Sequence, residues 1–443
     1  MKKTVLSKLN ASIIKVVGAC YIAETDVRLF VSAGFNTMDL IDVNENATED
    51  EKRDLILKTQ IFYKDKYYRD FNEIMNLGGN ENSVTALIQK KPIKFEIIGA
   101  NDGDAHGLIE VISESFELYR FRDGITIFAL SVDTSNVNLR AASEICRYLR
   151  NFACKIVYKQ SEYNLSDFIS SVFLCNISIR GENALIDSFS GSKFKIYSVL
   201  NFDNEFNDWK YEDMKILAFE IGTGISVGGI EKNHLLKPAD RYYDLIMADS
   251  IAIFDNYIGL PLRDSLTFVG HNLYKKDIYT HHTYDRVYFK IYVYSLYVKY
   301  SINRFGTILY NNPIAVFDEF QEFSNNYVFG FISFDFLPNI ISEKIFSSLN
   351  IRSEMDLLEK RIVSLSQRIR DKHNRVVALL LAVISILTGL GAIKDFVEVM
   401  DIISSGIGFA KYQLTIGLLG IVFLSIVFIF LKNRKNIKWF LFK

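Results

Sequence analysis

Four arginines stand beside aromatic residues at two places in the sequence where they could bind an anion. Arg120 and Arg122 lie between two segments of strand-like composition, and Arg147 and Arg150 share the polar face of a helical segment at 138–153. A guanidinium donates paired hydrogen bonds to phosphate and stacks on aromatic rings. These residues are therefore our candidate ligand-binding residues for a small anionic nucleotide. A solvated polar surface is the more ordinary interpretation, and the sequence alone leaves both open.

Three other motifs carry chemically capable residues in less specific patterns. The run Gly222–Gly229 resembles a phosphate-binding loop, but Val227 interrupts the dinucleotide fingerprint and no clear helix follows, which favours a glycine-rich turn. Asp102–Gly107 offers oxygen and imidazole ligands without the calcium-loop spacing, so a hairpin loop is preferred. His281 and His282 are adjacent and would point apart on a helix, so no metal site is expected there.

The sequence contains no arrangement that is typical of catalysis. It lacks a nucleophile elbow, a Walker motif and a metalloprotease helix, so an enzyme is not expected. The cysteines have no metal-binding spacing and are interpreted as buried thiols: Cys20, Cys146, Cys154 and Cys175.

The elements that must position these residues indicate an α+β cytoplasmic domain with a mixed sheet. Helical spacing is clear at 138–153, and mixed strands and helices over residues 1–238 predict a ligand-sensing domain. Residues 239–339 predict an aromatic-rich helical region, in which the tyrosines of 284–300 cover most of a helix surface. The predicted strands lie at 12–22, 27–35, 93–100, 107–120, 124–132, 155–159 and 194–199.

A heptad pattern predicts a stalk helix at 340–375. Pro338 is the last proline of the chain, so an unbroken helix from about residue 340 is allowed. The spacing fits either packing within the chain or self-association, and we prefer a parallel homo-oligomer because the pattern continues into an apolar run. The seam consists of Ile351, Met355, Leu358, Ile362, Leu365 and Ile369.

Two uncharged apolar runs, 376–393 and 414–431, predict two transmembrane helices. Eighteen residues of helix measure roughly 27 Å, about the thickness of a bilayer core. Basic residues flank the pair at 368–375 and in the tail 432–443, whereas the loop 394–413 is slightly acidic. The positive-inside rule then places both termini in the cytoplasm, the loop outside, and the chain in the cytoplasmic membrane.

The distribution of charge argues against direct binding of nucleic acid. The whole chain carries −1, with +3 at 368–375, +5 in the tail and −1 in the loop, which leaves −8 for residues 1–367. A body of that sign is a poor non-specific binder of DNA or RNA.

Small residues follow one face of the first apolar run. They allow close packing of helices, and they equally suit a narrow pore lined by hydroxyl groups and exposed backbone, so both interpretations stay open. The candidate pore-lining residues are Ala378, Ala382, Ser385, Thr388, Gly389 and Ala392.

The layout of residues 340–443 resembles the CorA magnesium-channel superfamily. Members of that family join a cytoplasmic α/β domain to a stalk helix, a pore-lining span, a short outer loop, an outer span and a lysine-rich tail, and assemble as homopentamers. The tail is matched here by Lys432, Arg434, Lys435 and Lys438. The family's Gly-Met-Asn signature is replaced by Gly389–Lys394, which argues against ordinary magnesium uptake.

The chain is also similar to CorA-like membrane effectors of type III CRISPR antiviral defence, which have large divergent cytoplasmic domains. That resemblance implies gating by a nucleotide second messenger, an adenosylmethionine–AMP conjugate (SAM-AMP). Three hypotheses follow from the sequence. The first is an oligomeric effector or channel gated by such a nucleotide. The second is a divergent transporter of divalent cations such as Mg²⁺, and the third is a non-conducting membrane anchor for a binding domain.

Overall fold

The computed structural model describes most of the first 403 residues and divides the chain into two compact units, Met1–Val363 and Ser364–Lys443. The second apolar run at 414–431, the tail at 432–443, Asp102–Gly107, His281 and His282 lie outside the described residues. The described residues are 9, 12–23, 27–38, 48, 50, 53, 54, 57, 61, 64–75, 84–99, 108–135, 137–175, 193–202, 211–228, 230, 238–271, 273, 283–309 and 313–403.

An eleven-stranded sheet forms the centre of the first unit. Its order is β10-β11-β9-β1-β6-β5-β4-β7-β8, with β3 paired to β5 and β2 paired to β3. β9 and β11 run parallel and the other pairs antiparallel, so the predicted mixed sheet is confirmed. The strands are β1 (Ile13–Tyr21), β2 (Asn36–Thr37), β3 (Thr85–Gln89), β4 (Ile93–Ile98), β5 (Leu108–Arg120), β6 (Ile125–Val132), β7 (Lys155–Tyr158), β8 (Ser161–Asn164), β9 (Lys195–Phe202), β10 (Tyr257–Leu262) and β11 (Ser265–His271).

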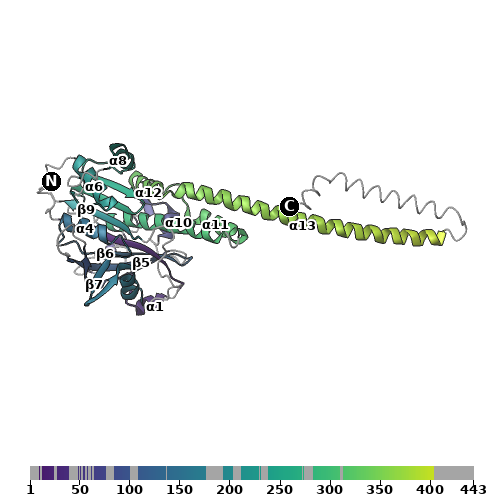
Figure 1. The fold of residues 1–443 in the computed structure, drawn as a ribbon, viewed down its shortest axis with the longest axis horizontal. Coiled ribbons are helices and arrows are strands. Elements are labelled where there is room, and N and C mark those ends of the chain that lie inside the picture. The colour runs from purple at the N-terminus through teal and green to yellow at the C-terminus, as the bar shows by residue number, and fades with distance from the viewer. Residues whose placement is uncertain are drawn as a thin grey trace. The chain divides into compact units, whose positions relative to one another are not determined.

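Helices cover both faces of this sheet. On one face, alternate strand residues such as Val16 and Leu118 join a single apolar core with α4 (Leu139–Tyr148), α5 (Leu165–Phe168), the π-helix η2 (Ile169–Phe173) and α6 (Tyr211–Thr223). The other face carries the π-helix η5 (Thr283–Tyr288) and α10 (Phe289–Ile308), and Figure 1 shows α10 grouped with α11 and α12. α10 is buried on all sides from Phe289 to Ile302, as its tyrosine pattern predicts.

The helix predicted at 138–153 is confirmed as α4, although it ends at Tyr148. The side chain of Asn138 caps its first turn by accepting a hydrogen bond of 2.9 Å from the backbone nitrogen of Ala141. Its buried stripe contains Ala142, Ile145 and Cys146, and the next residue, Leu149, is buried as well. The described residues of the first unit also form α1 (Val27–Ser32), α3 (Arg69–Ile74), α8 (Asp240–Met247), α11 (Pro313–Tyr327) and α12 (Phe336–Ser348).

Two predicted elements are wrong. The strand expected at 27–35 is the short helix α1, which inserts Phe30 into the core and ends at Ser32, two residues before Gly34, whose positive φ of 88° suits the turn after a helix. The helical region expected at 239–339 contains the hairpin β10–β11 at 257–271. β10 is an edge strand of the sheet, where Pro261 is tolerated because its missing donor is not needed on the outer side.

The long C-terminal helix is α13, which runs from Ile351 to Ile403. The unbroken helix expected from about residue 340 is divided, because α12 ends at Ser348 and Asn350 has a positive φ of 54°. The first ten residues of the predicted loop 394–413 continue the helix. An i,i+4 ion pair between Lys394 and Glu398, at 3.7 Å, supports this extension.

The described residues contain one helix that is long and apolar enough to cross a membrane, within Ile351–Val399. Its most apolar window has a mean hydropathy of 2.7 and is not buried by the rest of the chain. Leucines such as Leu381 and Leu387 are 58% and 63% exposed. Such a stretch is compatible with a membrane protein, because exposed leucine is favourable in lipid and unfavourable in water.

Close contact between β1 and β6 generates the first prediction. A Cβ atom at Gly18 would lie 2.3 Å from the ring of Phe128, so Gly18→Ala forces a shift in a packed core. We expect the free energy of unfolding to fall by about 1–3 kcal/mol, measured by denaturant titration of the full chain in detergent. Gly306→Ala in α10 is the matched control, since nothing lies within 4 Å of a Cβ there. It should stabilise the protein slightly, and equal stabilities of the two variants would contradict the packing described.

Candidate functional site

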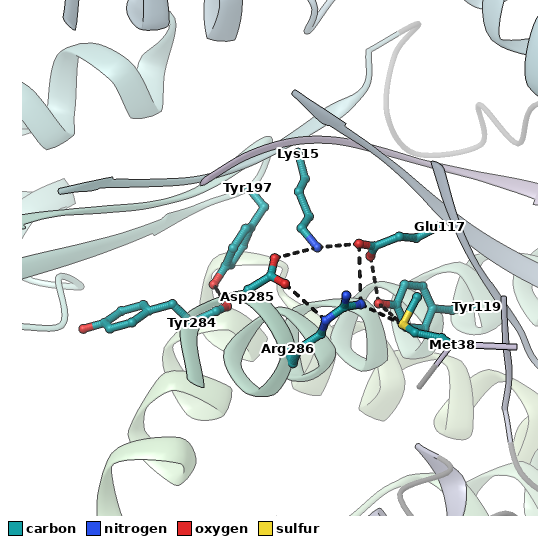
Figure 2. A network of polar contacts seen from close by, with 8 residues as sticks. All are labelled: Lys15, Met38, Glu117, Tyr119, Tyr197, Tyr284, Asp285 and Arg286. Atoms are coloured by element: carbon teal, nitrogen blue, oxygen red, sulfur yellow. Dashed lines mark hydrogen bonds and ion pairs between the residues drawn. The ribbon is translucent and has the colours of Figure 1, made fainter. Parts of the chain in front are cut away.

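A network of charged side chains is buried between the sheet and its second helical face, and Lys15 is at its centre. Lys15 lies on β1, is 1% exposed, and points towards η5 (Figure 2). Its amino group lies 2.8 Å from Oε1 of Glu117 on β5 and 2.9 Å from Oδ1 of Asp285 on η5. It also lies 4.3 Å from the ring centroid of Phe289, a cation–π contact.

Arg286 completes the network on the helical side. Its Nε lies 3.1 Å from Oδ2 of Asp285, and its NH1 lies 3.7 Å from Oε1 of Glu117 (Figure 2). Lys15, Glu117, Asp285 and Arg286, here called the charged quartet, therefore balance to zero net charge. Such balance is the condition under which charges can be buried, because an unpaired ion in the interior is very costly.

Tyrosine hydroxyls tie the charged quartet to the backbone around it. Tyr119 donates to Oε2 of Glu117 at 2.9 Å, and burial followed by the charge of Glu117 raises the pKa of Tyr119 well above its usual value. Tyr197 on β9 donates to the backbone oxygen of Tyr284 at 2.5 Å, which fixes the first turn of η5 against the sheet. The network therefore joins β1, β5 and β9 to the start of α10.

Lys290, in the first turn of α10, is a buried cation next to this network. It is 7% exposed, and burial followed by the charge of Arg286 lowers the pKa of Lys290 to about 7, against the opposing effect of Glu117. The charge state of this lysine therefore changes near neutral pH, unlike that of an ordinary lysine.

Two of the four candidate ligand-binding arginines lie at the β5–β6 hairpin. Arg120 is buried, and its guanidinium donates to the backbone oxygens of Ile22 and Ala23 at 3.2 and 3.4 Å. Arg122 is exposed at the turn. The backbone contacts of Arg120 connect the hairpin to the end of β1, so this side chain has a structural use within the chain.

The other two arginines lie on either side of the glycine-rich turn that follows α6. NH1 of Arg147 donates to Oγ of Ser226 at 2.9 Å, and NH2 of Arg150 donates to the backbone oxygen of Ile221 at 3.1 Å. The segment Gly222–Gly228 is thus a glycine-rich turn, as favoured from the sequence, and it lies at the end of α6, a helix that was not predicted. Gly224 and Gly228 have positive φ values of 77° and 72°.

This turn already holds an anion, which is a side chain of the protein itself. The carboxylate of Glu220 is fully buried and accepts hydrogen bonds of 3.0 and 3.1 Å from the backbone nitrogens of Gly228 and Ile230. The nitrogens that would otherwise bind phosphate are therefore occupied from within. Arg147 and Arg150 remain candidates, but the loop beside them is not a free phosphate cradle.

The stalk seam and the small-residue face both lie on α13. Leu358 and Ile362 are 5% and 1% exposed, so the first part of the seam packs within the chain, whereas Met355, Leu365 and Ile369 are half-buried. The candidate pore-lining residues lie in the exposed apolar part of the helix: Ala378, Ala382, Ser385, Thr388, Gly389 and Ala392. A Cβ at Gly389 would meet nothing within 4 Å.

The thiols and the possible metal ligands give no further candidate. Cys20, Cys146 and Cys154 are buried and Cys175 is exposed, which corrects the interpretation of all four as buried. Burial raises the pKa of Cys20 and Cys146 to about 12, which disfavours the reactive thiolate. Within the described residues, no group of three or more histidine, cysteine or acidic side chains could hold a metal ion.

The charged quartet was missed by sequence reasoning, although a signal was present. Lys15 interrupts the otherwise apolar strand Ile13–Tyr21, and a lysine within a fully buried strand requires a carboxylate partner. Lys195 on β9 and Lys290 on α10 interrupt apolar segments in the same way. What the sequence does not show is which carboxylates lie opposite, because Glu117 and Asp285 are 102 and 270 residues away from Lys15.

A double-mutant cycle tests whether the charged quartet acts as a unit. Lys15→Met leaves an excess negative charge in the interior and should cost about 3–5 kcal/mol of unfolding free energy. Lys15→Met combined with Glu117→Gln leaves Asp285 and Arg286 paired, so its cost should be smaller than the sum of the single changes by about 1–3 kcal/mol. Lys94→Met, in the exposed pair Lys94–Glu110, is the control and should cost at most about 1 kcal/mol. Additive effects at Lys15 and Glu117 would contradict the network.

Lys290 generates a prediction about pH. The unfolded chain retains this proton up to about pH 10, whereas the folded chain releases it near pH 7. The unfolded state therefore binds more protons in this window, and unfolding free energy should rise with pH from about 7 to 10, by on the order of 2–4 kcal/mol. Lys290→Met should remove this rise and stabilise the protein most at or below pH 7. Denaturant titrations across pH measure both, and parallel profiles for the variant and the parent protein would rule the effect out.

Comparison with known proteins gives no relative from which a role could be transferred. The chain matches none of the protein-family models, curated proteins or solved structures with which it was compared. The candidate site therefore depends on its own geometry: a neutral charged quartet under α10, and two arginines beside the turn after α6.

Proposed function

We propose that this protein is a homo-oligomeric membrane effector, in which the N-terminal unit binds a small anionic nucleotide and α13 transmits the change to the membrane. The resemblance of its layout to CorA-like proteins suggests a pentamer with both termini in the cytoplasm and two spans per chain. By the same resemblance, the proposed messenger is of the SAM-AMP type and the proposed role is antiviral defence of the type III CRISPR kind.

The observation that carries this proposal is the continuity of α13. At its first residues the helix is anchored in the first unit, where Ile351, Leu358 and Ile362 are buried and Glu354 forms an ion pair with Lys299 of α10. The same helix continues into the exposed apolar stretch that begins at Val376. A displacement of its first turn would thus reach the apolar segment through hydrogen-bonded backbone, because a helix transmits rotation and translation along its axis.

The small-residue face favours a conducting form of the assembly. Ala378, Ala382, Ser385, Gly389 and Ala392 follow one side of the helix, and Leu387 lies on the opposite side. Serine and threonine hydroxyls together with exposed glycine backbone provide polar groups that a water-filled path needs.

A non-conducting anchor is the second candidate. It is favoured by the burial of Leu358 and Ile362 within the chain, because these residues are then not available to hold several stalks together. In that case the apolar part of α13 would only keep the N-terminal unit at the membrane surface.

Flux through liposomes that contain the full chain distinguishes the candidates. We expect dye or ion release with an adenosine-based nucleotide messenger and no release with Mg²⁺ alone. Release driven by Mg²⁺ in the absence of nucleotide would support a divalent-cation transporter, and a reconstituted protein without flux in either condition would support the anchor. Native mass spectrometry of the detergent complex supplies the oligomeric state, and a monomer would contradict both channel hypotheses.

A substitution in the small-residue face tests whether this face lines the path. Gly389→Leu should reduce flux by about tenfold or more, because it places a bulky apolar group where the helix has its smallest residue. Among the described residues there is room for the start of a side chain here, since nothing lies within 4 Å of a Cβ at that position. Leu387→Val, on the opposite side of the same helix, is the matched control and should leave flux unchanged. Equal losses in both variants would contradict the assignment.

A further inference from the structure

Arg150 is a buried cation whose hydrogen bonds are incomplete. It follows α4, is 7% exposed, and NH2 donates to the backbone oxygen of Ile221, while its buried Nε has no hydrogen-bond partner among the described residues. The C-terminal carbonyls of α6 offset part of its charge. A guanidinium has five N–H donors, however, and a charge of this kind is rarely buried without a carboxylate or phosphate. Burial accordingly lowers the pKa of Arg150.

A second unpartnered donor lies at the same place. The hydroxyl of Tyr292 on α10 is 1% exposed and has no hydrogen-bond partner among the described residues. Burial raises the pKa of Tyr292, and the nearby charges of Asp264 and Arg150 act on it in opposite directions. A buried tyrosine hydroxyl usually finds an acceptor, so two such donors close together indicate a missing acceptor.

Further cations lie around these two donors. Lys195 lies 2.6 Å from Asp264; burial lowers the pKa of Lys195, and the charges of Arg263 and Arg150 lower it further against the effect of Asp264. Burial lowers the pKa of Lys299, and the charge of Arg263 adds to this effect. The cations Arg150, Lys195, Arg263 and Lys299 are thus linked electrostatically to one another and to the carboxylates of Asp264 and Glu354. The set reaches solvent at the β10–β11 turn, where Arg263 is exposed and the side chain of Asp264 is 28% exposed.

We propose that this end of the sheet is a binding subsite for a phosphate group, with Arg150 and Tyr292 as hydrogen-bond donors and Lys195, Arg263 and Lys299 as the charges that attract it. Phosphate fits because it accepts several hydrogen bonds at once and carries a charge opposite to that of these cations. The subsite adds detail to the proposed function. It rests on that function for the identity of the ligand, since the phosphate would be part of the anionic nucleotide.

The position of Lys299 connects the subsite to α13. Lys299 is 3% exposed and forms an ion pair with Glu354, which lies in the first turn of α13 and is 39% exposed. A phosphate that draws Lys299 towards itself weakens this pair, because one ammonium group cannot approach two anions equally well. The ligand would then act by loosening the anchored start of α13. It would do so because it binds more tightly to the state of the protein in which the pair Lys299–Glu354 is weakened.

Binding of inorganic phosphate to the full chain in detergent tests the subsite directly. At constant ionic strength, we expect the melting temperature to rise with phosphate concentration, and isothermal titration calorimetry to give a saturable affinity. Arg150→Gln should weaken that affinity by about 10- to 100-fold, as expected for loss of a charged hydrogen bond. Arg140→Gln, at an exposed position on α4, the helix that precedes Arg150, is the matched control and should change it less than about twofold.

Tyr292→Phe keeps the test decisive if Arg150→Gln does not fold. It removes only an unpartnered hydroxyl, so the fold should be kept while phosphate affinity falls several-fold. Hydrogen exchange of the amides of Ile351–Leu358 gives a second readout: phosphate should accelerate it in the parent protein and leave it unchanged in Tyr292→Phe at the same concentration.

The outcome separates the subsite from the proposed function. If phosphate binds with dependence on Arg150 and Tyr292 but no nucleotide produces flux, the subsite stands and the effector proposal fails. If phosphate does not bind, or binds equally to the parent protein and both variants, the subsite is overturned whatever the flux measurements show.

Discussion

The balance of buried charge in the quartet of Lys15, Glu117, Asp285 and Arg286 is the constraint on which the arrangement of the first unit depends. Each layer contributes one cation and one anion, Lys15 and Glu117 from the sheet and Asp285 and Arg286 from η5, and the cation of each layer also contacts the anion of the other. Apolar packing alone would tolerate sliding of α10 over the sheet, because the hydrophobic effect is not directional. The two ion pairs that cross from the sheet to η5, Lys15–Asp285 at 2.9 Å and Arg286–Glu117 at 3.7 Å, are lost when the helix slides, so the charged quartet specifies one register of helix on sheet.

This register determines where the rest of α10 places its polar side chains. With the first turn of α10 held over β1 and β9, Tyr292 packs against Tyr197 of β9 and feels the charge of Asp264, and Lys299, two turns further along, meets Glu354 of α13. A single helix therefore carries contacts with the sheet at its start and with the stalk beyond its middle. Lys299 also feels the charge of Arg263, so a change of charge near Asp264 would act on the ion pair that holds the start of α13.

Much of the sheet and the helix α4 were predictable from the sequence, whereas the site was not. β4 alternates apolar and polar residues with a period of two, β5 and β6 are longer strand-like runs, and α4 repeats apolar residues with a period of 3.6. In these elements most of the apolar residues of the sequence are ones that the structure buries. The failures occur where a short segment depends on distant partners. Val27–Ser32 alternates like a strand but is a helix because Phe30 and Phe35 must both enter the core, and β10 contains Pro261, which is acceptable only at the edge of the sheet. The four candidate arginines were chosen by composition, and composition cannot show that Arg120 is used by the backbone of Ile22 while Arg150 is left with an unpartnered nitrogen.

The division between α12 and α13 gives the stalk a joint next to these charges. Asn350, with its positive φ, lets the chain change direction between Ser348 and Ile351, so α13 does not inherit the orientation of α12 rigidly. Its first turns are held instead by the burial of Ile351, Leu358 and Ile362 and by Lys299. The apolar contacts resist separation but permit small rotations, whereas the ion pair selects one rotation. A stalk that is held by packing and oriented by one ion pair can change its orientation without unfolding, and this is the property that a transmitting helix needs.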